Sequence, residues 1–129
     1  MAAQPDPTAS VADTVAAVRV WVRAHEPELA PFREHPTGDL AEGIAATQPL
    51  RKLLFDAGWT RLGWPEECGG IGGSAVQRAA ALDAFAAAGY AIPEVHGTVE
   101  IVAPMLIRFA PQLAAAHVPA GLSGDEVWC

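Results

Sequence analysis

The chain has 129 residues, of which 51% are apolar, and a formal net charge of −7, with eight Lys and Arg residues against fifteen Asp and Glu. This length and apolar content fit one folded domain and exclude a disordered chain. The basic residues are spread thinly, which excludes the basic stripe of a nucleic-acid-binding protein. The N-terminus lacks the basic start and apolar centre of a signal peptide, and no apolar run approaches the roughly 20 residues that span a bilayer. We therefore expect a cytoplasmic protein without a membrane span.

The first predicted element is an amphipathic helix that follows a flexible tail, residues 1–9. Ser10 and Asp13 resemble a capping box in its acidic form, and the pattern ends near His25. Four valines recur at the spacing of one helical face: Val11, Val15, Val18 and Val22. The helical domain is therefore predicted to begin at residue 10, and we expect it to extend to residue 124.

The second predicted helix follows a long connection over residues 26–46, in which three prolines and two glycines interrupt any helical period. A short helical turn around Leu40 is compatible with this stretch. Thr47 is the predicted N-cap of the helix, because Pro49 is tolerated in a first turn. Gly58, followed by Trp59, has the pattern of a glycine C-cap with a hydrophobic contact.

A glycine-rich run over residues 64–74, Trp-Pro-Glu-Glu-Cys-Gly-Gly-Ile-Gly-Gly-Ser, separates the two halves of the chain. Glycine favours left-handed backbone conformations and Pro65 fixes its own φ, so this run predicts a tight, ordered loop between helices. Ser74 and Gln77 form a capping box that opens a third helix, which ends near Gly89.

The last third of the chain predicts two more helices and the start of a β-strand. Pro93 suits the first turn of a helix that extends to Phe109. Pro111 begins a shorter helix through Ala116, which Pro119 closes. Residues 125–129 have the pattern of a strand entry. The fold class predicted for the chain is an all-α helical bundle with this incipient strand at its C-terminus.

Several chemistry-bearing motifs have simpler structural explanations. The spacing Gly70, Gly72, Ala75 formally satisfies the dinucleotide fingerprint, but no buried strand precedes it, so a turn between helices is favoured. Adjacent carboxylates at Glu66 and Glu67 are expected to face solvent. The two cysteines are far apart and form no metal-binding pattern with the four histidines, so we expect two unpaired thiols and no metal site.

One helical face of the fourth predicted helix carries Ile92, His96, Val99 and Ala103, next to a second apolar face. A helix that is apolar on two sides is deeply buried or lines a cavity. From the residues alone, both interpretations remain open, and the buried core is the more common one.

The order of these signals resembles the N-terminal helical domain of the acyl-CoA dehydrogenase family. The resemblance depends on Leu53 to Trp59, on the Pro-Glu-Glu-x-Gly-Gly-x-Gly run from Pro65 to Gly72, and on Pro104 to Phe109. Val118-Pro119 and Gly124 to Cys129 are similar to the family's strand-entry segment. Ala110, and the sparse charge from Pro111 to His117, depart from the family pattern and suggest a divergent branch.

The resemblance implies an FAD-dependent enzyme that oxidises an acyl-CoA thioester, with an electron-transfer flavoprotein or a similar acceptor and a homo- or hetero-oligomeric assembly. It places the catalytic base and most FAD contacts in domains beyond Cys129, so this chain is expected to contribute no catalytic or cofactor-binding residue and to be inactive alone. The helix matching residues 92–110 helps to wall the acyl pocket, which implies five pocket residues: Ile92, His96, Gly97, Val99 and Ala103. The polar His96 and Glu100 disfavour a simple straight-chain lipid substrate. A non-catalytic helical module, such as a degenerate partner subunit, is the alternative.

Overall fold

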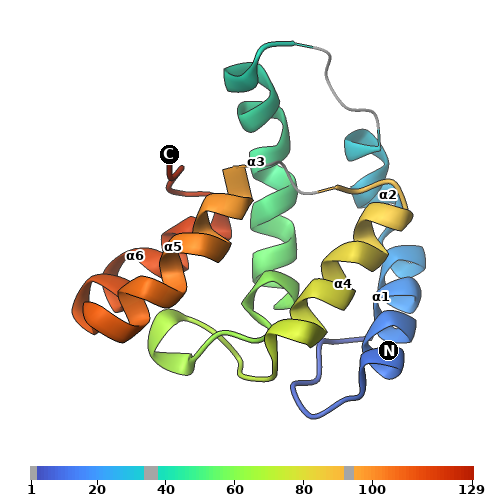
Figure 1. The fold of residues 1–129 in the computed structure, drawn as a ribbon. Helices are drawn as coiled ribbons and strands as arrows, with labels where there is room; N and C mark the ends of the chain where they lie inside the picture. Colours follow the sequence, from blue (N-terminus) through green and yellow to red (C-terminus); the bar gives the residue numbers. More distant parts are fainter. Residues whose placement is uncertain (1–2, 34–37, 92–94) are drawn as a thin grey trace.

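The computed structural model describes residues 3–33, 38–91 and 95–129. These residues form α-helices joined by short 3-10 helices and contain no β-strand, so the all-α prediction is confirmed (Figure 1). The α-helices are α1 (Val11–Ala24), α2 (Glu26–Leu29), α3 (Leu40–Asp56), α4 (Ala75–Ala87), α5 (Val95–Phe109) and α6 (Pro111–Ser123). The 3-10 helices are η1 (Ala30–Phe32), η2 (Trp59–Arg61) and η3 (Glu66–Cys68).

Helices α1, α3 and α4 share the first of two hydrophobic cores. Its centre is an aromatic cluster in which Trp21, Trp59 and Phe85 meet edge to face, with ring centroids 5.7–6.2 Å apart. The predicted valine face supplies Val18 and Val22 to this core. Val11 lies at the exposed first turn of α1, where the Ser10 side chain accepts a hydrogen bond from the Asp13 N–H as predicted. Gly58 ends α3 with a φ of 94°, and the fully buried Trp59 follows it.

The second core joins α5 and α6 to the glycine-rich loop and to α3. Val99 and Ala103 of α5 pack with Val118 and Leu122 of α6 around Trp64 of the loop. Figure 1 shows α5 and α6 side by side, on the opposite side of α3 from α1 and α4. The glycine-rich loop therefore connects two packed halves of one helical body.

The predicted start of α3 at Thr47 is wrong, because the helix begins seven residues earlier, at Leu40. Asp39 is the N-cap, and its carboxylate accepts the Glu42 N–H at 2.9 Å. Thr47 lies inside the helix, where its hydroxyl donates to the Gly43 carbonyl at 2.8 Å. The first turns of α3 project beyond the bundle (Figure 1) and bury few side chains. The sequence therefore lacks the apolar periodicity that would have indicated a helix there.

The predicted end of α6 at Pro119 is also wrong, because the helix continues to Ser123 and ends at Gly124, whose φ is 85°. Pro119 packs against the glycine-rich loop, because a Cβ atom added to Gly69 would lie 3.2 Å from the Pro119 ring. Val118 and Leu122 are fully buried on either side of it. The free energy gained by burying this face of α6 outweighs the cost of the backbone hydrogen bond that Pro119 removes from the helix.

The two ends of the chain both pack on the helices. The Gln77 side chain donates hydrogen bonds to the carbonyls of Asp6 and Ala9, so part of the predicted flexible tail, residues 3–9, contacts α4. Residues 125–129, predicted to enter a strand, are irregular here, and Trp128 lies against Gly121 of α6. Pro93 and Ile92 lie outside the described residues.

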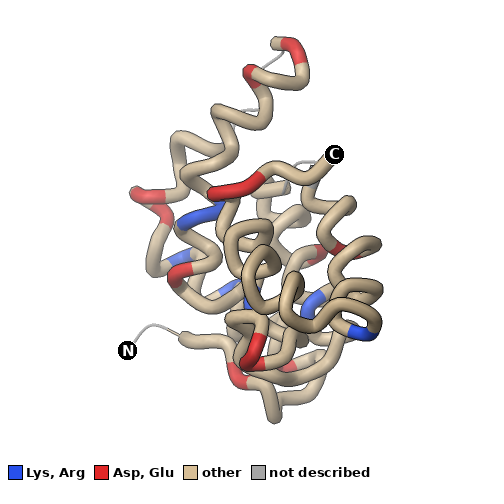
Figure 2. Tube along the Cα trace, turned by 90° about the vertical axis from the view of Figure 1, so that its left-hand side faces the viewer, with Lys and Arg blue, Asp and Glu red and all other residues tan. Residues whose placement is uncertain are grey.

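Charge and thiol chemistry follow the expectations from composition. In Figure 2 the Lys and Arg residues are scattered over several elements. Both cysteines are free, with Cys68 buried and Cys129 exposed. None of the helices in the described ranges is long and apolar enough to cross a membrane.

Candidate functional site

The glycine-rich loop is a closed, ordered turn, as predicted. The Gly63 N–H donates to the Gly72 carbonyl at 2.7 Å, and the Gly72 N–H donates to the Trp64 carbonyl at 3.0 Å. Gly70 passes so close to Trp64 that any Cβ atom would collide with its carbonyl. The loop thus presents Trp64 and Leu62 to α4 in a fixed position.

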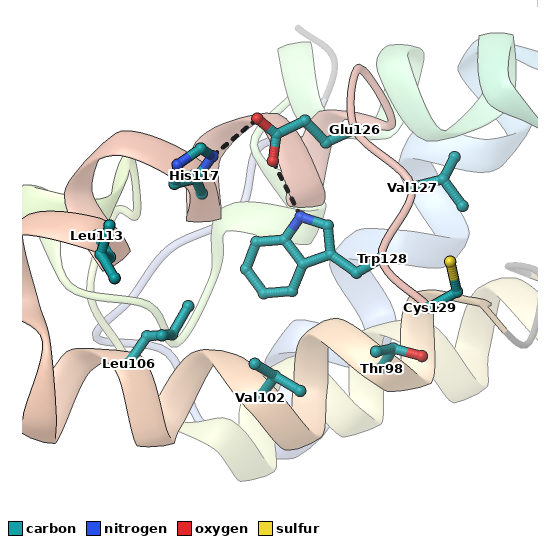
Figure 3. Close-up of a pocket in the computed structure, with 9 residues that line it drawn as sticks. All are labelled: Thr98, Val102, Leu106, Leu113, His117, Glu126, Val127, Trp128 and Cys129. Atoms are coloured by element: carbon teal, nitrogen blue, oxygen red, sulfur yellow. Dashed lines mark hydrogen bonds and ion pairs between the residues drawn. The ribbon is translucent and has the colours of Figure 1, made fainter.

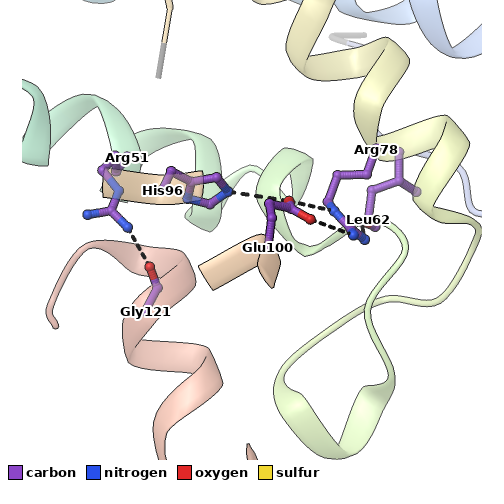
Figure 4. A network of polar contacts seen from close by, with 6 residues as sticks. All are labelled: Arg51, Leu62, Arg78, His96, Glu100 and Gly121. Atoms are coloured by element: carbon purple, nitrogen blue, oxygen red, sulfur yellow. Dashed lines mark hydrogen bonds and ion pairs between the residues drawn. The ribbon is translucent and has the colours of Figure 1, made fainter. Parts of the chain in front are cut away.

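Arg78 of α4 joins this loop to α5 through its guanidinium group. Its Nε and Nη2 each donate to one carboxylate oxygen of Glu100 at 2.8 Å, and its Nη1 donates to the Leu62 carbonyl at 3.2 Å (Figure 4). The guanidinium lies 3.9 Å from the centre of the Trp64 ring, in cation–π contact. The bidentate geometry fixes both side chains, because the planar fork matches the carboxylate.

Glu100 stays ionised at this half-buried position. Burial on its own raises the pKa of the carboxyl group, but the interactions with His96 and Arg78 outweigh burial and lower the pKa to about 2. The side chains of Arg78 and Glu100 are 6% and 31% exposed. The pair is therefore shielded enough from water for its electrostatic interaction to exceed that of a surface salt bridge.

His96 lies one turn before Glu100 on the same helix, and its side chain is 5% exposed. Its Nε2 is 3.7 Å from Glu100 Oε1, which is close enough for an ion pair if the ring is protonated but too long for a hydrogen bond. Neither ring nitrogen has a hydrogen-bond partner among the described residues. Figure 4 shows the ring directed toward the Glu100 carboxylate.

The other predicted pocket residues on α5 lie in two different environments. Val99 and Ala103 are fully buried in the second core, where they hold α5 against α6 and the loop. Gly97 is exposed, and a Cβ atom on it would meet nothing within 4 Å. Ile92 lies outside the described residues. The structure thus places His96 next to Glu100 and buries it, like Val99 and Ala103, while Gly97 is exposed.

A groove of about 320 Å³ opens between α4 and α5, next to the Arg78–Glu100 pair. We call it the α4–α5 groove. Three of its lining residues are charged: Arg78, Asp83 and Glu100. The other three are small or apolar: Ala75, Ala79 and Leu82. The Arg78–Glu100 ion pair therefore forms part of the wall of this groove.

A second groove of about 480 Å³ lies between α5, α6 and residues 126–129 (Figure 3). The Glu126 carboxylate accepts the Trp128 indole N–H at 3.0 Å and contacts His117 Nδ1 at 2.9 Å. These interactions lower the pKa of the Glu126 carboxyl, the His117 contact most of all. The three side chains tie the C-terminal segment to α6, and none of the predicted pocket residues that the structure describes, His96, Gly97, Val99 and Ala103, lines this groove.

Arg51 of α3 is a buried cation that sequence reasoning missed. It is 1% exposed, and its Nη2 donates to the Gly121 carbonyl near the end of α6 at 2.5 Å. Its Nε and Nη1 have no partner among the described residues, and burial lowers the pKa of the guanidinium. The sequence did not indicate Arg51 or Arg78 as site residues, because their hydrogen-bond partners are distant in the sequence.

Comparison with known proteins assigns this chain to a family. Residues 13–124 match the acyl-CoA dehydrogenase N-terminal domain. Two curated relatives, both named acyl-CoA dehydrogenase IpdE1, are similar: the protein of Mycobacterium tuberculosis is 35% identical over 100 residues and that of Mycolicibacterium smegmatis 33%. Each match covers 77% of this chain and 24% of the relative, so the chain spans about a quarter of the relatives' length. No solved structure matches the chain. On the match over residues 13–124, the chain belongs to the acyl-CoA dehydrogenase family, as its N-terminal helical domain.

Proposed function

We propose that this chain is the N-terminal part of an FAD-dependent acyl-CoA dehydrogenase and that it contributes one wall of the acyl pocket. The observation that carries the proposal is the family match over residues 13–124, together with relatives that bear this name. The reaction class is α,β-dehydrogenation of an acyl-CoA thioester, with electrons passing to an electron-transfer flavoprotein or a similar acceptor.

The glycine-rich loop does not fit FAD. The glycine-rich loop carries the formal fingerprint, but its N–H groups at Gly63, Gly70 and Gly72 are used within the loop, and Trp64 fills the space at Gly70. No phosphate could approach that backbone closely, as the fingerprint requires. The flavin chemistry therefore belongs to other parts of the complete protein, and no step of it is assigned to these residues.

The contribution proposed for this chain is to shape the pocket and exclude water. His96 and Gly97 of α5 are the proposed contacts for the acyl group, and Val99 and Ala103 keep the helix fixed behind them. Burial of an acyl tail contributes about 0.8 kcal/mol per CH2, so a rigid helix wall yields useful binding energy. The Arg78–Glu100 pair, which bridges α4 and α5 beside the groove, would hold the spacing of the two walls.

The absorbance spectrum of the complete protein, as its gene encodes it, tests this proposal. Visible flavin bands that an acyl-CoA bleaches under anaerobic conditions are the expected result. A colourless protein that binds neither flavin nor an acyl-CoA would overturn the proposal and favour a non-catalytic helical module.

A further inference from the structure

The groove of about 480 Å³ between α5, α6 and the C-terminal segment is lined mainly by apolar side chains, and we call it the α5–α6 groove. On α5 its wall is a row of residues at every fourth position: Thr98, Val102 and Leu106. On the other side, Leu113 of α6 and Val127 are 52% and 43% exposed. Exposed apolar surface of this kind is unfavourable in water, so an occupant that buries it would be stabilised there.

The C-terminal segment forms a fixed wall of this groove. The indole ring of Trp128 packs so closely on Gly121 of α6 that a Cβ atom on this glycine would lie 3.0 Å from the ring. The indole N–H donates to the Glu126 carboxylate at 3.0 Å, and the Glu126 backbone N–H donates to the Ala120 carbonyl at 3.0 Å. The chain is therefore held as far as Trp128, and the groove is formed before an occupant enters it.

The charged side chains that line the groove already serve each other. One carboxylate oxygen of Glu126 contacts Nδ1 of His117 at 2.9 Å, and the other accepts the Trp128 N–H. A charged ligand group would have to displace one of these contacts, whereas apolar side chains would meet a ready surface. The lining therefore favours an apolar occupant.

The direction of the chain indicates which segment this occupant is. Figure 3 shows Cys129 beside Thr98 at one end of the groove, with Leu106 and Leu113 at the other end. Consecutive Cα atoms are only about 3.8 Å apart, so residues that follow Cys129 in a longer protein start at this end of the groove. The chain covers 24% of each curated relative, which leaves ample length to follow.

We propose that the α5–α6 groove is the docking site for the segment that directly follows Cys129 in the complete protein, bound in an extended conformation along the row from Thr98 to Leu106. This row is about 12 Å long at 1.5 Å per helical residue, which about four extended residues cover. The inference rests on the proposed function, because it takes the chain to be the N-terminal part of a longer protein.

A cysteine scan of the complete protein tests the path. In a Cys129→Ser background, Leu106→Cys is combined with a cysteine at each of the first eight positions after residue 129, one position at a time. A disulfide forms where two Cα atoms lie within about 7 Å of each other. Under mild oxidation, we expect one or two positions, about four residues beyond residue 129, to give at least tenfold more intramolecular crosslink by mass spectrometry than the remaining positions.

Val20→Cys provides the matched control. Val20 is 48% exposed on α1, which lies on the opposite side of α3 from the groove, so it should crosslink with none of the eight positions. Val102→Glu puts a charge in the middle of the row and should raise the hydrogen-exchange rates of the docked segment by about tenfold or more. Val76→Glu, at a 65% exposed position of α4, should leave these rates unchanged. The melting temperature of each variant shows whether it is folded.

The outcomes separate this inference from the proposed function. It is overturned if Leu106→Cys crosslinks no better than Val20→Cys, or if its disulfides join two molecules, because a second copy then occupies the groove. A flavin dehydrogenase with either result keeps the proposed function and loses only the docking site. A colourless protein that gives the expected crosslinks keeps the docking site and loses the proposed function. A gene that ends at Cys129 overturns both.

Discussion

At Gly70 the loop backbone passes so close to the Trp64 carbonyl that there is no room for a Cβ atom. The Trp64 ring contacts the guanidinium of Arg78 on α4, and that guanidinium binds Glu100 on α5. The absence of a side chain at Gly70 therefore lets the loop, α4 and α5 approach one another. The sequence predicted a tight loop from its glycines and proline, because backbone preferences are local. It could not predict which glycine is required by contact, since that depends on how the loop folds back on itself.

We expect Gly70→Ala to lower the free energy of unfolding by about 1–3 kcal/mol, the usual cost of forcing an atom into a packed site. Gly43→Ala is the matched control: Gly43 lies inside α3, where a Cβ atom meets nothing within 4 Å. That substitution should raise the free energy of unfolding by about 0.5–1 kcal/mol, because alanine is the better helix former. Urea denaturation measures both. Equal effects of the two substitutions would mean that the loop is not as tightly closed as described.

Because the pKa of Glu100 is lowered in the folded protein, the free energy of unfolding depends on pH in the acidic range. The folded pKa, about 2, lies below the ordinary value of 4.5, so the pair stabilises the fold fully above pH 4.5 and loses this contribution as the pH falls from 4.5 to 2. The loss is at most about 3 kcal/mol, because one pKa unit corresponds to 1.36 kcal/mol.

Glu100→Gln removes this titration. We expect the variant to be less stable than the wild type at pH 7 and to lose less stability between pH 4.5 and pH 2, in a series of urea denaturation curves. Glu28→Gln, which alters an exposed carboxylate on α2, serves as the control and should follow the wild-type curve. If the wild type and Glu100→Gln lose stability in parallel, the Arg78 pair contributes nothing in solution.

Among the helices, the boundaries set by local chemistry were predictable and those set by tertiary packing were not. The caps at Ser10 and Ser74 and the glycine C-cap at Gly58 were all found, because each is a contact within a few residues. Helix α6 passes Pro119 only because Val118 and Leu122 are buried against other elements. The Arg78–Glu100 pair, between residues 22 positions apart, was missed for the same reason.

The start of α3 gives a direct test of one corrected boundary. Asp39→Ala should destabilise the protein by about 1 kcal/mol, because it removes the N-cap that accepts the Glu42 N–H. Thr47→Ala should cost less, since Thr47 lies inside the helix, where alanine has the higher propensity. Thermal unfolding monitored by circular dichroism gives both values. A larger loss for Thr47→Ala would restore Thr47 as the N-cap.

On the scale of the whole molecule, α5 has one buried face and one exposed apolar face. Ile101, Met105 and Phe109 recur at every fourth position and are 71%, 59% and 76% exposed. The sequence predicted that α5 is apolar on two sides, but which side faces solvent depended on the packing of α6 and the loop. A contiguous exposed stripe of this kind is typical of a contact surface and rare on a free monomer.

We therefore expect the 129-residue chain on its own to self-associate through this stripe and to bind a hydrophobic dye. Replacing Ile101, Met105 and Phe109 together by Gln should shift the sedimentation profile toward the monomer and reduce dye fluorescence, because the apolar area that drives association is removed. Val20 and Val76 are exposed singly on α1 and α4, and replacing both by Gln is the control. The control should leave association unchanged, since scattered apolar side chains do not form a surface that two molecules can share. A wild-type chain that stays monomeric at high concentration and binds no dye would show that the stripe is too small to hold two copies together.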